Sequence, residues 1–210
     1  MMTVYWLPID KYEGHATYEE LKDRKVVAQG WSAIGDLSGL CNITDKQVFY
    51  AQIQMIGDQA YGNVDWWLKD RQEAMPRAMW YLLIEAKSGD IFVGKEGINI
   101  RGICQIKRDG LVSYRYDRDY EYAQTIGFPV EWIDWDESIF GHPPTPPAMM
   151  RGVKHLQTEY ERLIDCWNLY LAKPIKMFGS GGNGVRPLSE KKTAGVSVYR
   201  DSIAGKEKRT

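Results

Sequence analysis

A glutamate and a lysine two positions apart, Glu85 and Lys87, form the E-x-K pattern of metal-dependent nucleases. In such an enzyme both side chains point at a divalent cation, and a further carboxylate, here Asp65 or Asp70, completes the site. The pattern requires a strand, because alternate residues of a strand share one face. Here it ends a predicted helix that must stop at a Ser-Gly turn, so we expect no catalytic residue and keep the nuclease as an alternative.

The other residue types that could bind a metal or form a disulfide are scattered along the chain. The sequence has no CxxC, no HExxH and no Cys/His cluster. The cysteines are Cys41, Cys104 and Cys166, and the histidines are His15, His142 and His155. We therefore expect no metal, no cofactor and no disulfide framework.

Aromatic side chains are unusually frequent, with 8 Trp and 13 Tyr among 210 residues. A core of this size usually needs fewer, so some of the rings are expected to face a ligand. The aromatic content therefore indicates a ligand-binding surface.

Charge is divided unevenly, although the net charge is only -1. Residues 1–173 carry 19 basic and 25 acidic side chains, and residues 174–210 carry 8 and 3. A basic tail on an acidic body is typical of nucleic-acid binders, but also of tails that only stay solvated. Four basic residues of the body are candidate phosphate contacts, with solvated surface as the alternative: Lys87, Lys95, Arg101 and Lys107.

Strand patterns occupy residues 3–8 and 25–31, which we expect to share one sheet. Between residues 44 and 86 the pattern is helical, with Thr44 or Asp45 as a cap and Pro76 at the start of a later helix. Short strand patterns then follow one another, separated by Gly, Asp or Pro turns: DIFVGKEG, INIRGICQIKRDG, VSYRYD and VEWIDWD. Such close spacing usually produces a small curled barrel.

Four prolines in GHPPTPP, residues 141–147, predict a stiff linker. We expect a domain over residues 1–140, this linker, an amphipathic helix over 148–173, and a mobile, Gly-rich tail over 174–210. The helix carries an apolar stripe at spacings of 3 and 4: Met149, Val153, Leu156, Tyr160, Leu163, Trp167 and Tyr170. We expect the stripe to pack on the chain's own barrel and the protein to be a monomer; docking on a partner is the alternative.

No stretch approaches the roughly 20 apolar residues that a membrane helix requires, and the N-terminus lacks the pattern of a signal peptide. We therefore expect a cytoplasmic protein with no membrane partner.

Three stretches, in this order, resemble the EVE domain of the PUA-like superfamily: AQGWSAIGDLS at residues 28–38, WYLLIEAKSGDIFVGKEG at 80–97 and IRGICQI at 100–106. The first stretch is similar to the N-terminal specificity domains of McrB-type modification-dependent restriction NTPases. The resemblance covers roughly residues 1–140. It implies an α+β fold, kin to YTH domains, with a small curled β-barrel and flanking helices. Such a domain accepts a flipped, modified base in an aromatic pocket.

Carried over to this sequence, the motif makes Trp31 the stacking platform for the base. Asp36 would accept a hydrogen bond from an exocyclic amine, or else cap the turn that follows it. Ser32 is a neighbouring hydrogen-bond candidate, and Trp80 is a candidate pocket wall with a core position as its alternative. Asn99 lies between two isoleucines of a strand pattern, so its amide faces away from both and could read a base edge.

The chain departs from the restriction NTPases in one respect, because it has no GxxxxGK[ST] phosphate loop. The resemblance therefore implies a non-catalytic reader of modified nucleic acid, with DNA favoured over RNA. It would act in restriction or phage–host conflict, with a separate effector protein as a further partner. The alternative is a protein-interaction or inhibitory subunit that acts on a nucleic-acid-processing complex.

Overall fold

The computed structural model describes residues 2–9, 17–70, 73–146, 153–156 and 160–172. The chain divides into two compact units after Pro174, and every described residue belongs to the first. The basic tail expected at residues 174–210 lies outside the described residues.

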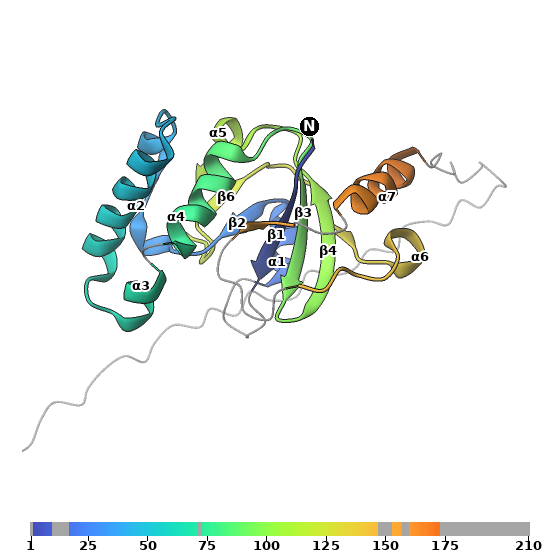
Figure 1. Cartoon of the computed structure of the whole chain (residues 1–210), viewed down its shortest axis with the longest axis horizontal. Coiled ribbons are helices and arrows are strands. Elements are labelled where there is room, and N and C mark those ends of the chain that lie inside the picture. The colour runs from blue at the N-terminus through green and yellow to red at the C-terminus, as the bar shows by residue number, and fades with distance from the viewer. Residues whose placement is uncertain (1, 10–16, 71–72, 147–152, 157–159, 173–210) are drawn as a thin grey trace, which may run out of the picture. The chain divides into compact units, whose positions relative to one another are not determined.

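The centre of the first unit is a five-stranded sheet with the strand order β7-β4-β3-β1-β8 (Figure 1). β1 pairs in parallel with β3, whereas the other three pairings are antiparallel. The strands are β1 (Val4–Ile9), β3 (Ile91–Glu96), β4 (Asn99–Gln105), β7 (Ile133–Asp134) and β8 (Lys154–His155). A second, three-stranded sheet has the order β2-β6-β5, with β2 (Val27–Gln29), β6 (Gln124–Ile126) and β5 (Arg115–Tyr116).

The central sheet is buried on both faces, which explains why β1 and β3 are nearly continuous apolar runs. Successive side chains of a strand point to opposite faces. Tyr5 and Leu7 therefore enter the core shared with the helices of residues 46–85. Val4 and Trp6 enter a second core on the other face, together with Leu163.

The main helices are set by local signals that the sequence carries. Thr17 forms a capping box with Glu20 at the start of α1, and Asp45 accepts from the backbone N–H of Val48 at the start of α2. The helices are α1 (Tyr18–Arg24), α2 (Lys46–Tyr61), α3 (Asp65–Asp70), α4 (Ala74–Met79), α5 (Gly110–Ser113), α6 (Glu137–Phe140) and α7 (Tyr160–Ala172). Two 3₁₀ turns, η1 (Ser32–Ile34) and η2 (Ser38–Leu40), follow β2, and a π-helix, η3 (Trp80–Glu85), continues α4.

The α+β class is confirmed, but the expected barrel is not what the described residues form, because they make two open sheets and no closed barrel. The prediction that residues 3–8 and 25–31 share one sheet is wrong. β1 is hydrogen-bonded on both edges, to β3 and β8, so neither edge is left for β2. β2 pairs with β6 instead.

The C-terminal helix is shorter than the predicted span of residues 148–173. Within that span, Lys154 and His155 form β8 against β1, and α7 begins at Tyr160. Met149 lies outside the described residues. The stripe packs on the chain's own sheet, as predicted, because Leu163 and Trp167 are buried against Trp6 and Phe140. Among the described residues, no helix is long and apolar enough to cross a membrane.

Candidate nucleic-acid interface

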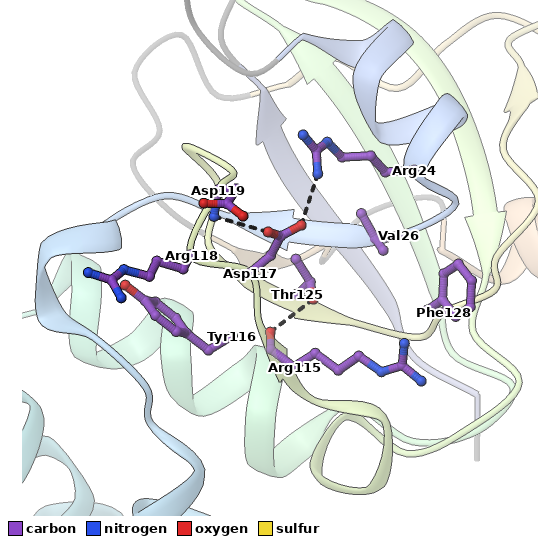
Figure 2. A pocket seen from close by; sticks show the side chains of 9 residues that line it. All are labelled: Arg24, Val26, Arg115, Tyr116, Asp117, Arg118, Asp119, Thr125 and Phe128. Carbon is purple, nitrogen blue, oxygen red and sulfur yellow. Dashed lines mark hydrogen bonds and ion pairs between the residues drawn. The ribbon is translucent and has the colours of Figure 1, made fainter.

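The second sheet carries an open pocket of about 460 Å³ (Figure 2). One wall comes from the end of α1 and the start of β2, and the other from β5, β6 and the turns beside them. The lining residues are Arg24, Val26, Arg115, Tyr116, Asp117, Arg118, Asp119, Thr125 and Phe128. Three guanidinium groups therefore surround one concavity.

The three arginines differ in how strongly they are held. Arg24 pairs with Asp117 at 2.9 Å and lies over the ring of Tyr120, 4.1 Å from its centroid. Arg115 is exposed and lies 5.1 Å from the ring centroid of Phe128, and Arg118 is exposed as well. Figure 2 shows the guanidinium groups of Arg115 and Arg118 directed toward opposite ends of the pocket. These two are the cations best placed to meet an anionic ligand.

The pocket adjoins the loop that contains Trp31. The Tyr116 hydroxyl donates to the carbonyl of Ser32 at 3.0 Å, and the Gln124 amide donates to the carbonyl of Gly35 at 3.0 Å. Tyr114 accepts from the backbone N–H of Leu37 at 2.9 Å. Burial raises the pKa of Tyr114, so this hydroxyl keeps its proton at neutral pH. The sheet thus holds the loop at three points along its length.

Trp31 itself has an unusual backbone conformation, with φ at 61°. A bulky residue in the left-handed region costs on the order of 1–3 kcal/mol, and such conformations persist only where the surroundings enforce them. Here the three hydrogen bonds that hold the loop supply that enforcement. The Trp31 side chain is partly exposed and packs at the edge of the main core.

The predicted base-pocket residues fall into three separate places. Trp31, Ser32 and Asp36 share the loop beside the pocket. Asp36 accepts from the backbone N–H of Ser38 at 2.9 Å, so it makes the turn-capping bond that was its alternative role. Trp80 is 7% exposed and lies on the π-helix η3, and Asn99 is exposed at the tip of the β3–β4 hairpin, in the other sheet.

Trp31 and Trp80 lie near opposite ends of α2. The backbone of Ala33 lies beside Tyr61, the last residue of α2, and the ammonium of Lys46, its first residue, lies over the ring of Trp80. At about 1.5 Å per residue a helix of this length spans roughly 20 Å. The two tryptophans therefore belong to different sites.

The four predicted phosphate contacts do not line the pocket. Lys87 donates to the carbonyl of Ile84 and lies 3.6 Å from Asp109, and Arg101 pairs with Glu96 at 2.6 Å. Lys95 is only 3% exposed, and both its burial and the charge of Lys154 lower its pKa. Lys107 is exposed, on the stretch that follows β4.

The arginines that line the pocket are not among the residues predicted from the sequence. Their signal is the run YRYDRDY at residues 114–120, in which two arginines are interleaved with three tyrosines and two aspartates. Arg24 carries no such signal, because it reaches the pocket through an ion pair with Asp117, 93 positions away.

Glu85 and Lys87 do not converge on a common point in the structure. Glu85 accepts from the Trp80 indole at 2.5 Å and lies 3.1 Å from His155, whereas Lys87 contacts Ile84 and Asp109. No group of three His, Cys, Asp or Glu side chains within the described part of the chain is arranged to hold a metal ion.

Comparison of the chain with protein-family models, with curated proteins and with solved structures gives no match. The resemblance to EVE domains therefore depends on the motifs at residues 28–38, 80–97 and 100–106.

Proposed function

We propose that this protein is a non-catalytic reader of modified nucleic acid, in which the loop around Trp31 accepts a flipped base and the arginine-lined pocket holds the adjacent backbone. The observation that carries the proposal is the bond between Tyr116, which lines the pocket, and Ser32, which follows Trp31. This bond joins the residue after Trp31 to the pocket that Arg115 and Arg118 line, which supports a shared role for the loop and the pocket. Modified DNA is the favoured ligand.

The pocket suits a phosphodiester backbone. A guanidinium group can donate two parallel hydrogen bonds to one phosphate, a geometry that a lysine ammonium cannot reproduce. Arg115 and Arg118 are exposed, so binding a phosphate would not require either one to break a buried ion pair. Phe128, itself 39% exposed, adds a ring on which a neighbouring base could stack.

The loop suits a flipped base. Extrusion of a base from the duplex costs a few kcal/mol, and stacking on a preformed aromatic platform offsets that cost. The strained backbone of Trp31 is held by bonds that exist before any ligand arrives. Ser32 lies beside the ring as a candidate hydrogen-bonding group. A PUA-like architecture and a role in restriction or phage–host conflict are part of the proposal, and the EVE-like motifs support both.

A panel of matched oligonucleotides, modified and plain, double-stranded and single-stranded, tests the proposal. We expect the wild type to prefer one modified duplex, and Trp31→Ala to weaken that preference about tenfold, because a stacking ring contributes roughly 1–3 kcal/mol. Arg115→Ala and Arg118→Ala should each weaken the binding of every oligonucleotide by a similar factor, whatever its sequence. Each should also reduce the slope of log affinity against log salt by about 0.9.

Arg108→Ala is the matched control, because this arginine is exposed but does not line the pocket. Its salt slope should equal that of the wild type. If the folded wild type binds no oligonucleotide at low salt, the proposal is wrong and the interaction-subunit alternative takes its place. If Lys107→Ala changes the salt slope and the two pocket arginines do not, the nucleic acid lies elsewhere.

A further inference from the structure

The ammonium group of Lys46 lies inside a ring of aromatic side chains. Its Nζ is 5.7 Å from the ring centroid of Tyr50, 5.8 Å from that of Trp80 and 5.5 Å from that of Tyr81. The carboxylate of Glu85 completes the enclosure, with Oε1 3.8 Å from the ammonium. Three aromatic faces and one carboxylate around a single cation are the elements of an aromatic cage.

The walls of the cage are fixed by contacts that do not involve Lys46. Trp80 packs edge-to-face on buried Phe49, with centroids 5.3 Å apart, and its indole N–H donates to Glu85 at 2.5 Å. Tyr81 stacks on His155 at 4.4 Å, and that histidine also lies 3.1 Å from the other Glu85 oxygen. Trp80, Tyr81 and Glu85 would therefore keep their positions if the lysine left.

The π-helix η3 brings the cage residues together. Trp80 and Glu85 are five positions apart, and the i→i+5 hydrogen bonding of a π-helix places residues of that spacing above one another. Tyr81 follows Trp80 on the same turn. π-Helical turns are rare, and those that occur are often located at functional sites. The position of η3 at the cage is consistent with a binding role.

Lys46 is poorly placed to serve only as a structural element. It is the first residue of α2, where the positive end of the helix dipole disfavours a cation, and the only nearby acid of the helix start, Asp45, has its carboxylate occupied by the backbone N–H of Val48. Its side chain is 43% exposed, so it can swing into solvent without opening the core. These properties suit a residue that fills the cage reversibly.

We propose that Tyr50, Trp80, Tyr81 and Glu85 form a binding site for an N-methylated lysine side chain, which Lys46 closes in the absence of ligand. The ligand class follows from the occupant that the structure shows, since the cage already accepts a lysine ammonium on its four-carbon stem. Methyl groups keep the charge while replacing N–H groups that water would solvate, and aromatic cages recognise such cations. The carboxylate distinguishes a cation from a neutral group of the same shape.

This site is separate from the base-binding loop, because it lies at the opposite end of α2. Its test is correspondingly independent of nucleic-acid binding. Changes in the cage should leave oligonucleotide affinity unchanged, and Trp31→Ala should leave cage binding unchanged. Failure of either proposal can therefore be recognised without the other.

The test titrates acetylated, amidated Nε-trimethyl-lysine into the full-length protein and into the Lys46→Ala variant, with calorimetry as the readout. We expect Lys46→Ala to bind the probe and the wild type to bind it about tenfold more weakly, the factor for a cage that is open about one-tenth of the time. The analogue with a neutral tert-butyl group in place of trimethylammonium should bind more weakly than the charged probe. Lys69→Ala, which removes an exposed lysine elsewhere, should behave as the wild type.

Two further variants, made on Lys46→Ala, assign the walls. Tyr81→Leu and Glu85→Gln should each weaken the charged probe, and Glu85→Gln should do so with little effect on the neutral analogue. Circular dichroism and the melting temperature verify that each variant is folded. The proposal is overturned if folded Lys46→Ala fails to bind the probe at millimolar concentration, or binds the charged and neutral analogues equally.

Discussion

The hydroxyl of Tyr114 donates a hydrogen bond of 2.6 Å to the amide oxygen of Gln124, a side chain with no exposed surface. The same hydroxyl accepts from Leu37, and the other end of the Gln124 amide donates to Gly35. This pair therefore connects the second sheet to the loop that carries Trp31. Removing one member of such a buried network is costly, because the remaining donors and acceptors lose their partner and still have no access to water.

Tyr114→Phe is expected to lower the free energy of unfolding by about 1–3 kcal/mol, because it leaves two buried partners without their hydrogen bond. Urea denaturation followed by fluorescence measures the change. Tyr160→Phe is the control, since the Tyr160 hydroxyl bonds only to the exposed side chain of Glu161 among the contacts described. An equal loss in both variants would contradict a structural role for the Tyr114 network.

Gly57→Ala is expected to destabilise the protein, although alanine is the better helix former by about 1 kcal/mol. A Cβ at this position of α2 would overlap ring atoms of Trp67, which is fully buried and whose indole N–H donates to Asp58 at 2.8 Å. Overpacking of a core typically costs about 1–3 kcal/mol. Gly39→Ala, where a Cβ would meet no atom within 4 Å, should change the melting temperature little.

The pair formed by Lys22 and Asp134 predicts a pH-dependent contribution to stability. The hydrogen bond from Lys22, at 2.8 Å, lowers the pKa of Asp134 below its unfolded value, as does a second bond from Tyr18. A carboxylate with a lowered folded pKa stabilises the fold above its unfolded pKa of about 4, and the contribution is lost as the pH falls below that value.

Asp134→Asn should therefore cost stability at pH 7 and cost progressively less between about pH 4 and pH 2. The effect is expected to be small, about 0.2–1 kcal/mol, because the aspartate side chain is 67% exposed. Thermal denaturation of both proteins across this pH range measures it. A cost that stays constant down to pH 2 would show that the charge of Asp134 is not responsible; Glu131→Gln, at another exposed site, serves as the control.

Leu163→Ala should remove about 2–5 kcal/mol of stability, because this side chain is fully buried in the core between α7 and the central sheet. Leu169→Ala, on the exposed face of the same helix, should be nearly neutral. Light scattering should report a monomer for both. A wild-type dimer that Leu163→Glu separates into folded monomers would instead place this face between two molecules.

The sequence predicts those parts of the fold whose signals are local. The Asp45 cap, the strand patterns of β1, β3 and β4, and the helical character of residues 44–86 all depend on neighbours within a few positions. The parallel pairing of β1 with β3 joins Val4 to Ile91, and no short pattern encodes it. Val153 and Leu156 are buried as the apolar spacing requires, but a spacing of 3 does not separate a helix from the short strand that forms there.

The sites were harder to predict than the fold. The motif predicts Trp31 as a site residue, whereas the pocket beside its loop depends on the contact between Arg24 and Asp117, which are far apart in sequence. The cage was missed because Trp80 and Glu85 would lie on different faces of a regular α-helix. Only the π-helical turn places the indole N–H against the carboxylate.

The position of β1 between β3 and β8 in the five-stranded sheet has a consequence for how the chain folds. Its two hydrogen-bonded neighbours, β3 and β8, come much later in the sequence, near Ile91 and Lys154. During synthesis β1 therefore has no strand to pair with until β3 has been translated, by which point more than half of the described unit has been made. Non-local pairing of this kind slows folding and prolongs the exposure of an unpaired strand. The β3–β4 hairpin can form first from local contacts, and insertion of β1 beside it would then add side chains to the cores on both faces of the sheet.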